Sequence, residues 1–337
     1  MKLIIQIPCY NEEETLPVTL RDLPQVEEIP GVDEIETLVI NDGSTDSTVQ
    51  VAREHGVDHI VDLGINRGLA FAWSAGLQAA LRAGADVIVN TDGDNQYCGE
   101  DIPSLVQPVV QREVDVVIGA RPIEQIGRFS WLKKRLQRLG SWMVSKCAGV
   151  RVEDAASGFR AYSATAAREL TLLSDYSHCT ETLIRAARRG LKFKNVPIRV
   201  NEQLRESRLF SSLPAYLARQ ARDIFRIAVM VHPLKVFEVP ALLLFLLGSA
   251  GCLRFLIYYF TGSGAGHVQS LIFSALFIMV AFLLGMVGVL ADMVASNHQL
   301  IEDTLVEIKR LDETNGTERQ RTEPRYERTE TAAGSGG

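Results

Sequence analysis

The stretch Val87-Ile88-Val89-Asn90-Thr91-Asp92-Gly93-Asp94-Asn95-Gln96 joins a short apolar run to a polar turn. The apolar run is typical of a buried strand, and alternate side chains of an extended segment point the same way. Asp92 and Asp94 are therefore expected to face one site together, and carboxylate oxygens are ligands that Mg²⁺ and Mn²⁺ prefer. A solvated Asp-Gly turn would have the same sequence. The rest of the chain has to separate the two interpretations.

Short apolar runs alternate with helical patterns over the first 120 residues. The predicted strands are 3–7, 36–40, 59–63, 86–90 and 114–118, and the predicted helices are 12–23, 47–54, 68–83 and 100–111. Such alternation is typical of an α/β fold with a mostly parallel sheet, in which ligands bind beyond the carboxyl ends of the strands. Polar clusters follow four successive strands, at 10–13, 41–46, 66–68 and 92–94. This recurrence favours a binding site over a solvated turn.

The chain is acidic overall, with a formal net charge of -6, but its charges are unevenly placed. No acidic residue stands between Glu124 and Glu153, and Asp223 is the only acid from Arg208 to Lys235. The overall charge gives no case for a nucleic-acid partner, whereas the two basic segments indicate an anionic partner or a membrane surface. The scattered cysteines argue against a disulfide framework or a zinc site.

Two long apolar stretches, 236–260 and 268–291, change the character of the last third. At about 1.5 Å per residue, either can cross a hydrocarbon core of about 30 Å. A pair of buried core helices is the alternative, but both stretches are apolar all round. The link 261–267 has no Lys or Arg, whereas the preceding segment is rich in both. The positive-inside rule then predicts a multi-pass protein of the cell membrane whose N-terminal α/β domain is cytoplasmic.

These patterns predict five parts of the chain. They are an α/β domain at 1–210, an amphipathic interfacial helix at 211–235, a two-helix transmembrane hairpin at 236–291, a cytoplasmic helix at 292–313 and a disordered tail at 314–337. An ordinary surface helix is the alternative for 211–235, but its place just before a span favours the interfacial interpretation. Homo-oligomerisation through the transmembrane helices stays open.

Six short motifs occur in the order found in family 2 glycosyltransferases. They are Pro8-Cys9-Tyr10-Asn11-Glu12-Glu13, Asp42-Gly43-Ser44-x-Asp46, Asn66-Arg67-Gly68, Asp92-Gly93-Asp94-Asn95-Gln96, Gly119-Ala120-Arg121 and Ser157-Gly158-Phe159-Arg160-Ala161. Over roughly residues 2–235 the chain resembles the dolichol-phosphate mannosyltransferase-like, polyprenyl-phosphate branch of that family. The resemblance implies a GT-A fold and the transfer of one sugar from a nucleotide-sugar to a polyprenyl phosphate.

The resemblance also implies roles for individual residues. Those expected at the nucleotide-sugar are Pro8, Tyr10, Asn11, Glu12, Asp42, Asp92, Arg205 and Arg208. Those expected to hold Mg²⁺ or Mn²⁺ are Asp92, Asp94 and Gln96. Those expected at the lipid phosphate are Arg121, Lys133, Lys134, Arg135 and Ser207. Arg205-Glu206-Ser207-Arg208 resembles an Arg-x-Ser-Lys element of the family, with Arg in place of Lys. That exchange keeps the charge but changes its geometry.

The residues expected to be catalytic are those that meet the negative charge that develops during sugar transfer. Negative charge grows on the departing nucleoside diphosphate, so the cation near Asp94 and the Arg205 guanidinium stabilise the transition state. The acceptor is already an anion, so a strong base is not required, and attack opposite the leaving group inverts the anomeric centre. Asp154 is the candidate for orienting or activating the acceptor phosphate. A structural pair with Arg160 or another cation is its alternative role.

Two rival functions remain. A processive polysaccharide synthase would carry a Gln-x-x-Arg-Trp motif and a longer set of spans, and Gln137-Arg138-Leu139-Gly140 does not fit that motif. A non-catalytic membrane scaffold that binds nucleotide would not be expected to retain Asp92, Asp94, Gln96 and Arg205. GDP-mannose and UDP-hexoses stay open as donors, and dolichyl and undecaprenyl phosphate as acceptors.

Overall fold

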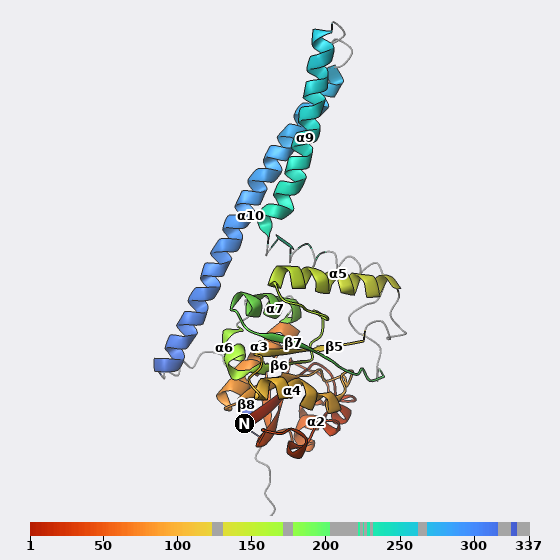
Figure 1. Cartoon of the computed structure of the whole chain (residues 1–337). Coiled ribbons are helices and arrows are strands. Elements are labelled where there is room, and N and C mark those ends of the chain that lie inside the picture. The colour runs from red at the N-terminus through yellow and green to blue at the C-terminus, as the bar shows by residue number, and fades with distance from the viewer. Residues whose placement is uncertain are drawn as a thin grey trace, which may run out of the picture. The chain divides into compact units, whose positions relative to one another are not determined.

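The computed structural model describes residues 1–122, 131–170, 178–202, 232–261, 268–315 and 325–328, together with the single residues 222, 225, 228 and 229. The chain divides into two compact units, of which the first is Met1–Leu213 with Asp312–Gly337 and the second is Pro214–Leu311. The first unit holds a mixed sheet with its covering helices, and the second holds two long apolar helices (Figure 1).

The sheet of the first unit has the spatial order β7-β5-β6-β4-β1-β2-β3-β8 among the described residues. Its strands are β1 Lys2–Cys9, β2 Glu34–Asn41, β3 His59–Asp62, β4 Val87–Asn90, β5 Val116–Ala120, β6 Arg160–Ser163, β7 Phe193–Pro197 and β8 Arg325–Arg328. β1 pairs in parallel with β2 and β4, β2 with β3, and β5 with β7. β6 lies antiparallel between β4 and β5. The predicted mostly parallel α/β sheet is thus confirmed.

Helices connect the strands and cover the sheet. They are α1 Leu16–Arg21, α2 Thr48–Glu54, α3 Leu69–Arg82, α4 Ile102–Val110, α5 Trp131–Ala148, α6 Ala164–Glu169 and α7 His178–Arg188, with short 3₁₀ turns η1 Val26–Glu28 and η2 Gly99–Asp101. Every predicted strand and helix of the first 120 residues is present, with shifted ends. The helix predicted from residue 12 begins only at Leu16, because Asn11 takes the left-handed conformation (φ 55°) and starts a turn there.

Side chains of β1 alternate between two apolar cores. Leu3, Ile5 and Ile7 belong to the core that α4 covers, whereas Ile4 belongs to the core that α3 covers through Trp73. A parallel strand buried on both faces is expected to be apolar throughout. This is why β1 reads as one continuous apolar run, and why its carboxyl end is held rigidly beneath the polar loops.

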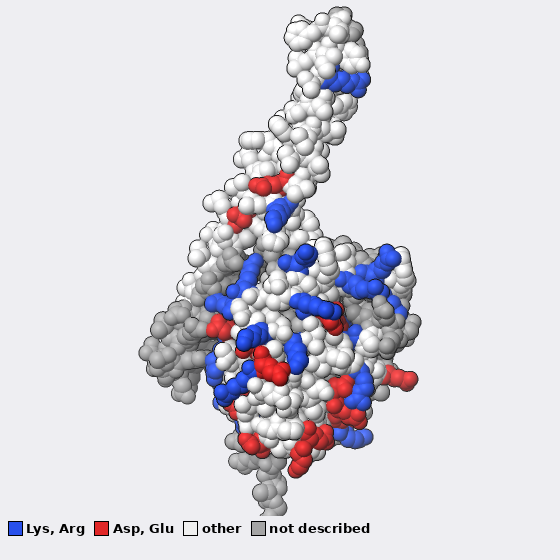
Figure 2. Space-filling model, viewed as in Figure 1, with Lys and Arg blue, Asp and Glu red and all other residues white. Residues whose placement is uncertain are grey.

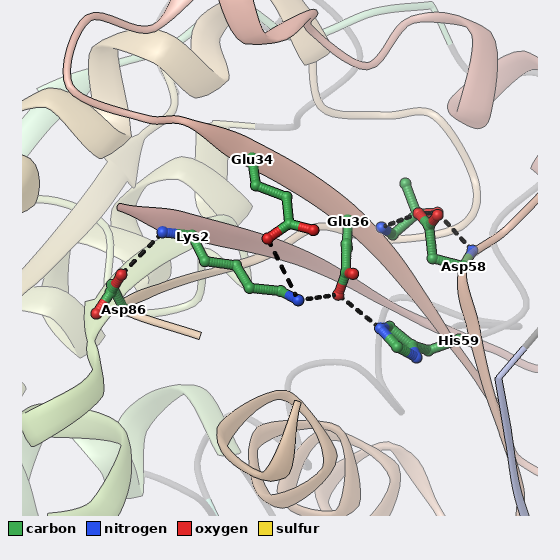
Figure 3. A network of polar contacts seen from close by, with 7 residues as sticks. Lys2, Glu34, Glu36, Asp58, His59 and Asp86 are labelled. Atoms are coloured by element: carbon green, nitrogen blue, oxygen red, sulfur yellow. Dashed lines mark hydrogen bonds and ion pairs between the residues drawn. The ribbon is translucent and has the colours of Figure 1, made fainter. Parts of the chain in front are cut away.

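A charged network closes the opposite, amino-terminal edge of the sheet (Figure 3). Glu36 Oε2 lies 2.7 Å from Lys2 Nζ and 2.6 Å from His59 Nε2, and Glu34 approaches the same ammonium at 3.6 Å. Burial would raise the pKa of Glu36, but the hydrogen bonds from Lys2 and His59 outweigh it and lower that pKa. The network ties β1, β2 and β3 together at the edge away from the polar loops.

The second unit contains α9 Pro233–Phe260 and α10 Val268–Asn315 up to Leu311. The stretches Pro233–Phe260 and Val268–Asn297 are long and apolar enough to cross a membrane, with mean hydropathies of 2.0 and 2.6. Gly248 and Gly251 lie against α10, because a Cβ at Gly251 would come within 2.1 Å of Ser274 Oγ. Small residues let two helix backbones approach closely in a membrane. The pair is therefore packed as a helical hairpin.

Three predicted boundaries differ from the structure. The second span and the helix predicted at 292–313 form one continuous helix, α10, since the sequence between them has no Pro or Gly to interrupt it. The tail predicted to be disordered from residue 314 contains β8, which pairs antiparallel with β3. An edge strand offers unpaired backbone groups to any extended segment, whatever its side chains. The predicted interfacial helix at 211–235 lies largely outside the described residues, and its last three positions belong to α9.

Candidate active site

The polar loops meet at one edge of the sheet. β4, β1, β2 and β3 are neighbours and run in the same direction, so their carboxyl ends lie side by side. β5 also ends at this edge, because it and β4 are both antiparallel to β6. The four predicted polar clusters, at 10–13, 41–46, 66–68 and 92–94, therefore follow strands that end at this edge, and residues 121–122 after β5 join them.

The loops after β1 and β2 are interlocked through hydrogen bonds. The Asn11 backbone N–H donates to Ser44 Oγ at 2.9 Å, and Asn11 Oδ1 accepts from the Thr45 N–H at 2.8 Å. The Glu12 N–H donates to Thr48 Oγ1 at 2.8 Å. Between the two loops lies a cavity of about 240 Å³, lined by Asn11, Glu12, Glu13, Glu14, Thr15, Thr45 and Asp46. Two of the predicted nucleotide residues, Asn11 and Glu12, thus line an open pocket.

Other predicted nucleotide residues take different positions. Pro8 is buried within β1, whereas the Tyr10 side chain is 41% exposed at the strand end. Asp42 is buried, and its two oxygens accept from the backbone N–H groups of Arg67 at 2.7 Å and Gly68 at 3.0 Å. Burial raises the pKa of Asp42, and these two hydrogen bonds oppose that shift. Asp42 therefore orders the start of α3, while its contact with base or ribose stays a prediction.

The predicted metal residues lie together on the turn after β4. Asp94 accepts from the Gln96 N–H at 3.2 Å and from Gln96 Nε2 at 2.7 Å, and Asp92 is half-buried nearby. Burial, reinforced by the charges of Glu12, Asp92, Asp46 and Asp94, raises the pKa of the Cys9 thiol well above its usual value. The turn thus adds negative charge to a region that already holds carboxylates.

The donor set of this turn fits a hard cation. Two carboxylates and one amide supply oxygen ligands, and Mg²⁺ is usually bound by one or two carboxylates plus substrate phosphates. No group of three or more His, Cys, Asp or Glu residues is placed to hold a metal within the described ranges. Mg²⁺ bound by one or two carboxylates keeps positions for phosphate and water oxygens. Backbone packing fixes the turn, since the Gly93 carbonyl accepts from Thr19 Oγ1 at 3.1 Å and a Cβ at Gly93 would lie 3.0 Å from Cys9 Sγ.

Arg121 and Asp154 form a two-point ion pair beside this turn. Arg121 Nε lies 2.6 Å from Asp154 Oδ2 and Arg121 Nη2 lies 3.1 Å from Asp154 Oδ1, with Asp154 fully buried. Burial opposes the charge on Arg121, but Tyr97 and Asp154 raise the pKa of its guanidinium. Arg160 instead donates to the carbonyls of Cys179 and Ala155. The geometry therefore gives Asp154 a pairing role, with Arg121 rather than Arg160 as the cation.

Tyr97 connects the metal turn with the loop that carries Asp154. Its hydroxyl oxygen accepts from the buried Gly158 N–H at 3.0 Å, and its ring stacks on Phe159 at 4.9 Å between centroids. Asn90 Nδ2 donates to the Gly158 carbonyl at 2.9 Å and accepts from Gln6 Nε2 at 2.9 Å. The sequence reasoning missed this network, although a polar aromatic residue directly after Gln96 was a signal for it.

The segment before the predicted Arg205-x-Ser-Arg element runs along the metal turn. The Asn201 N–H donates to the Gln96 carbonyl at 3.0 Å, and Asn201 Nδ2 donates to the Asn95 carbonyl at 3.1 Å. Arg199 pairs with Asp101 at 2.7 Å and with Glu100 at 2.9 Å. The predicted residues Arg205, Ser207 and Arg208 lie outside the described residues, as does the side chain of Lys133.

Comparison with known proteins shows relatives over most of the first unit. The family model for glycosyl transferase family 2 matches residues 4–171. The undecaprenyl-phosphate mannosyltransferase of Micrococcus luteus is 31% identical over 62% of this chain and 88% of its own length. The dolichyl-phosphate hexose transferase of Haloferax volcanii is 29% identical over 61% of this chain and 86% of its own.

A solved structure shows the same fold. Glucosyl-3-phosphoglycerate synthase from Mycobacterium tuberculosis, solved with Mn²⁺ and uridine diphosphate, aligns with a TM-score of 0.52. It is 20% identical over 67% of this chain and 78% of its own. Together with the oxygen-ligand turn at the carboxyl edge of the sheet, these likenesses settle the family: the chain is a glycosyltransferase of family 2, in the dolichol-phosphate mannosyltransferase-like branch.

Proposed function

We propose that this protein transfers a single sugar from a nucleotide-sugar to a polyprenyl phosphate, with inversion, at the cytoplasmic face of the cell membrane. The observation that carries the proposal is the adjacency of two unlike polar groups. The oxygen-ligand turn of Asp92, Asp94 and Gln96 is joined through Tyr97 to the loop that holds the Arg121–Asp154 pair. An anionic donor and an anionic acceptor need such neighbouring sites. The relatives named for undecaprenyl and dolichyl phosphate support a lipid phosphate as acceptor.

Each side of the site has a role in the proposed reaction. On the donor side, Asn11 and Glu12 border the cavity that would receive the nucleoside. Asp92, Asp94 and Gln96 would hold Mg²⁺ or Mn²⁺, which supplies charge stabilisation for the departing diphosphate. Arg205 and Arg208 would close over the same diphosphate from the segment that Asn201 fastens to the turn.

On the acceptor side, the Arg121 guanidinium would orient the lipid phosphate, with Lys133, Lys134, Arg135 and Ser207 as further candidates. Asp154 keeps Arg121 in a fixed orientation, because both carboxylate oxygens bind that guanidinium. The phosphate oxygen of the acceptor is already anionic and needs positioning rather than deprotonation.

The test is a transfer assay with the full chain in membranes. A panel of radiolabelled GDP- and UDP-sugars is incubated with polyprenyl phosphate and Mg²⁺ or Mn²⁺, and label is counted in the lipid fraction. One donor is expected to label the lipid, and chelation of the cation is expected to abolish labelling. If no donor in the panel labels the lipid, the proposed function is wrong.

Asp94→Asn tests the metal turn within the same assay. The variant keeps the size of the side chain but removes a charged ligand, so transfer is expected to fall at least about 100-fold, in the range seen when a transition-state charge contact is lost. Asp33→Asn is the matched control, since Asp33 is an exposed carboxylate at the opposite edge of the sheet. If Asp94→Asn has full activity and unchanged thermal unfolding, the turn does not hold the catalytic cation.

A further inference from the structure

Residues 198–201, which follow β7, lie along the metal turn and hold its backbone. Asn201 faces three successive backbone carbonyls at the end of that turn. Its N–H donates to the Gln96 carbonyl at 3.0 Å, and its side-chain Nδ2 donates to the carbonyls of Asn95 at 3.1 Å and Tyr97 at 3.4 Å. A side-chain amide has two N–H donors, and here both are directed at the turn. One residue from a distant segment therefore holds three consecutive peptide groups.

The segment that carries Asn201 is itself fixed to the sheet. Ile198 is buried, and its N–H donates to the carbonyl of Ala120, the last residue of β5, at 3.0 Å. Arg199 binds Asp101 of η2 through two groups, since its N–H donates to Asp101 Oδ2 at 2.6 Å and its Nε donates to Asp101 Oδ1 at 2.9 Å. Asn201 therefore reaches the metal turn from a firmly anchored segment.

The part of the turn that Asn201 holds has an uncommon backbone conformation. Asn95 is buried and left-handed, with φ 55°, and a residue with a Cβ retains that conformation where surrounding contacts fix it. The chain reverses there and brings Gln96 back to Asp94, whose carboxylate accepts from the Gln96 N–H at 3.2 Å and from Gln96 Nε2 at 2.7 Å. The closeness of these two predicted ligands therefore depends on a conformation that Asn201 stabilises.

We propose that Asn201 is a positioning residue of the cation site. It acts through the backbone carbonyls of the turn, and so keeps the oxygen ligands of Asp94 and Gln96 where one Mg²⁺ or Mn²⁺ ion can meet both. The inference rests on the proposed function, in which this turn holds the cation. Partners that orient the ligands of a metal typically change its affinity about 10–100-fold when they are replaced. Loss of the Asn201 amide is expected to weaken cation binding within that range.

Titration of the full-length protein with Mn²⁺ alone tests this role. Electron paramagnetic resonance measures the free ion, whose signal is lost on binding, so the Kd is obtained in phosphatidylcholine nanodiscs without nucleotide, acceptor or turnover. Asn201→Ala is expected to raise the Kd at least about tenfold. Exposed acidic side chains, many of them gathered on the lower part of the first unit in Figure 2, bind Mn²⁺ weakly. Asp94→Asn is expected to lose the specific site and therefore measures that background.

Asn195→Ala is the matched control. Asn195 lies on β7 and is half-buried, its Nδ2 donates to the Arg151 carbonyl at 2.8 Å, and its Oδ1 accepts from the Glu153 N–H at 3.1 Å. The control variant therefore loses hydrogen bonds of the same kind, but none of them on the metal turn. It is expected to bind Mn²⁺ as wild type does. Equal weakening in Asn195→Ala and Asn201→Ala would indicate a general loss of stability and would overturn the inference.

A second substitution at the same position covers the case in which Asn201→Ala does not fold. Asn201→Asp keeps the side-chain volume but sets a carboxylate against the carbonyls of Asn95 and Tyr97. By charge alone the added acid would strengthen Mn²⁺ binding, so weaker binding supports the positioning role and tighter binding overturns it. Wild-type affinity in Asn201→Ala, with binding lost in Asp94→Asn, would overturn this inference and leave the proposed function intact. Equal binding in wild type and Asp94→Asn would overturn both.

Discussion

At the scale of single residues, Tyr97 is the position whose chemistry reaches both sides of the site. Tyr97→Phe keeps the ring that stacks on Phe159 but removes the hydroxyl oxygen that accepts from the buried Gly158 N–H. An unsatisfied buried donor costs about 1–3 kcal/mol. The loop with Asp154 should therefore shift, and kcat should fall about tenfold, which equals about 1.4 kcal/mol. Calorimetric titration with nucleotide and Mg²⁺ should show unchanged affinity.

Tyr162→Phe is the control for Tyr97→Phe. Tyr162 is also buried but packs in the other core, against Trp73 of α3. Asn90→Asp should reproduce the Tyr97→Phe defect, because it removes the donor to the backbone carbonyl of the same residue, Gly158. The two changes should be less than additive in kcat, since both act through one loop. Loss of nucleotide affinity in Tyr97→Phe would show instead that the residue serves the donor side.

Glu36 is expected to make the stability of the fold depend on pH in the acid range. Its pKa is lowered in the folded chain, where burial is outweighed by Lys2 and His59. A group whose pKa is lowered on folding stabilises the fold above its unfolded value, about 4.3 for Glu, and loses that contribution as pH falls through the folded value. Denaturant unfolding between pH 3 and pH 7 should therefore show stability falling below about pH 4.3, and Glu36→Gln should flatten this fall and lower stability at pH 7.

Glu34→Gln is the matched variant for that experiment. Glu34 also faces the Lys2 ammonium, but at 3.6 Å and with a side chain that is 55% exposed. Exposed ion pairs contribute about 0–1 kcal/mol, so its pH profile should follow wild type. If the stability of Glu36→Gln still falls steeply below about pH 4.3, another carboxylate is responsible for the acid dependence.

At the scale of elements, β8 completes the sheet at the β3 edge. Its partners are fixed in register, with His59 opposite Arg328 and Asp62 opposite Arg325. A chain ended after Asn315 lacks β8 and leaves the β3 edge unpaired, so backbone amides of residues 57–64 should exchange hydrogen faster, as weakly held segments do. Hydrogen–deuterium exchange with mass spectrometry measures this. A chain ended after Arg328 keeps β8 and should match wild type; equal exchange in both truncations would show that the pairing does not persist.

At the scale of the whole molecule, the proposed orientation in the membrane follows from where the cations lie. The link 261–267 has no Lys or Arg, and the residues before α9 are rich in Arg. Alkaline phosphatase inserted after Gly264 should therefore be active in bacterial cells, because that enzyme folds only outside the cytoplasm, and green fluorescent protein at the C-terminus should fluoresce. The two reporters are also exchanged between the two positions. Fluorescence of the protein fused at the link, together with activity of phosphatase fused at the C-terminus, would show that the orientation is the opposite one.

Periodicity made much of the first unit predictable. β1 to β5 and the helices between them were predicted because parallel strands buried on both faces are apolar throughout, and each lies next to a helix with a period near 3.6. β6 and β7 were not predicted. β6 pairs with distant segments of sequence, since Arg160 lies opposite Asn90 of β4, 70 positions away, and opposite Ile118 of β5, 42 positions away. Such pairing depends on neighbours in space and leaves little trace in a short segment.

The positions of some site residues along the chain were predictable for the same reason. The motif residues Asn11, Glu12, Asp92, Asp94 and Gln96 lie at strand ends, and strand ends can be read from apolar runs. The pairing of Arg121 with Asp154 joins residues 33 positions apart and was assigned to Arg160 or another cation. Local spacing does not show which of several nearby cations a buried carboxylate meets.

The sequence alone therefore determined the α/β class, the glycosyltransferase motifs and two apolar stretches of membrane length. Each of these features depends only on which residues occur in a short segment and on how they repeat there. Only the tertiary structure decided that Asp154 neutralises Arg121, that Tyr97 joins the two sides of the site and that β8 covers the β3 edge. These are contacts between distant segments. Their energies depend on burial and on hydrogen-bond geometry, which arise only when the chain has folded. The Asp92-Gly93-Asp94 turn belongs to both groups: its residues are in the sequence, and its neighbours are in the fold.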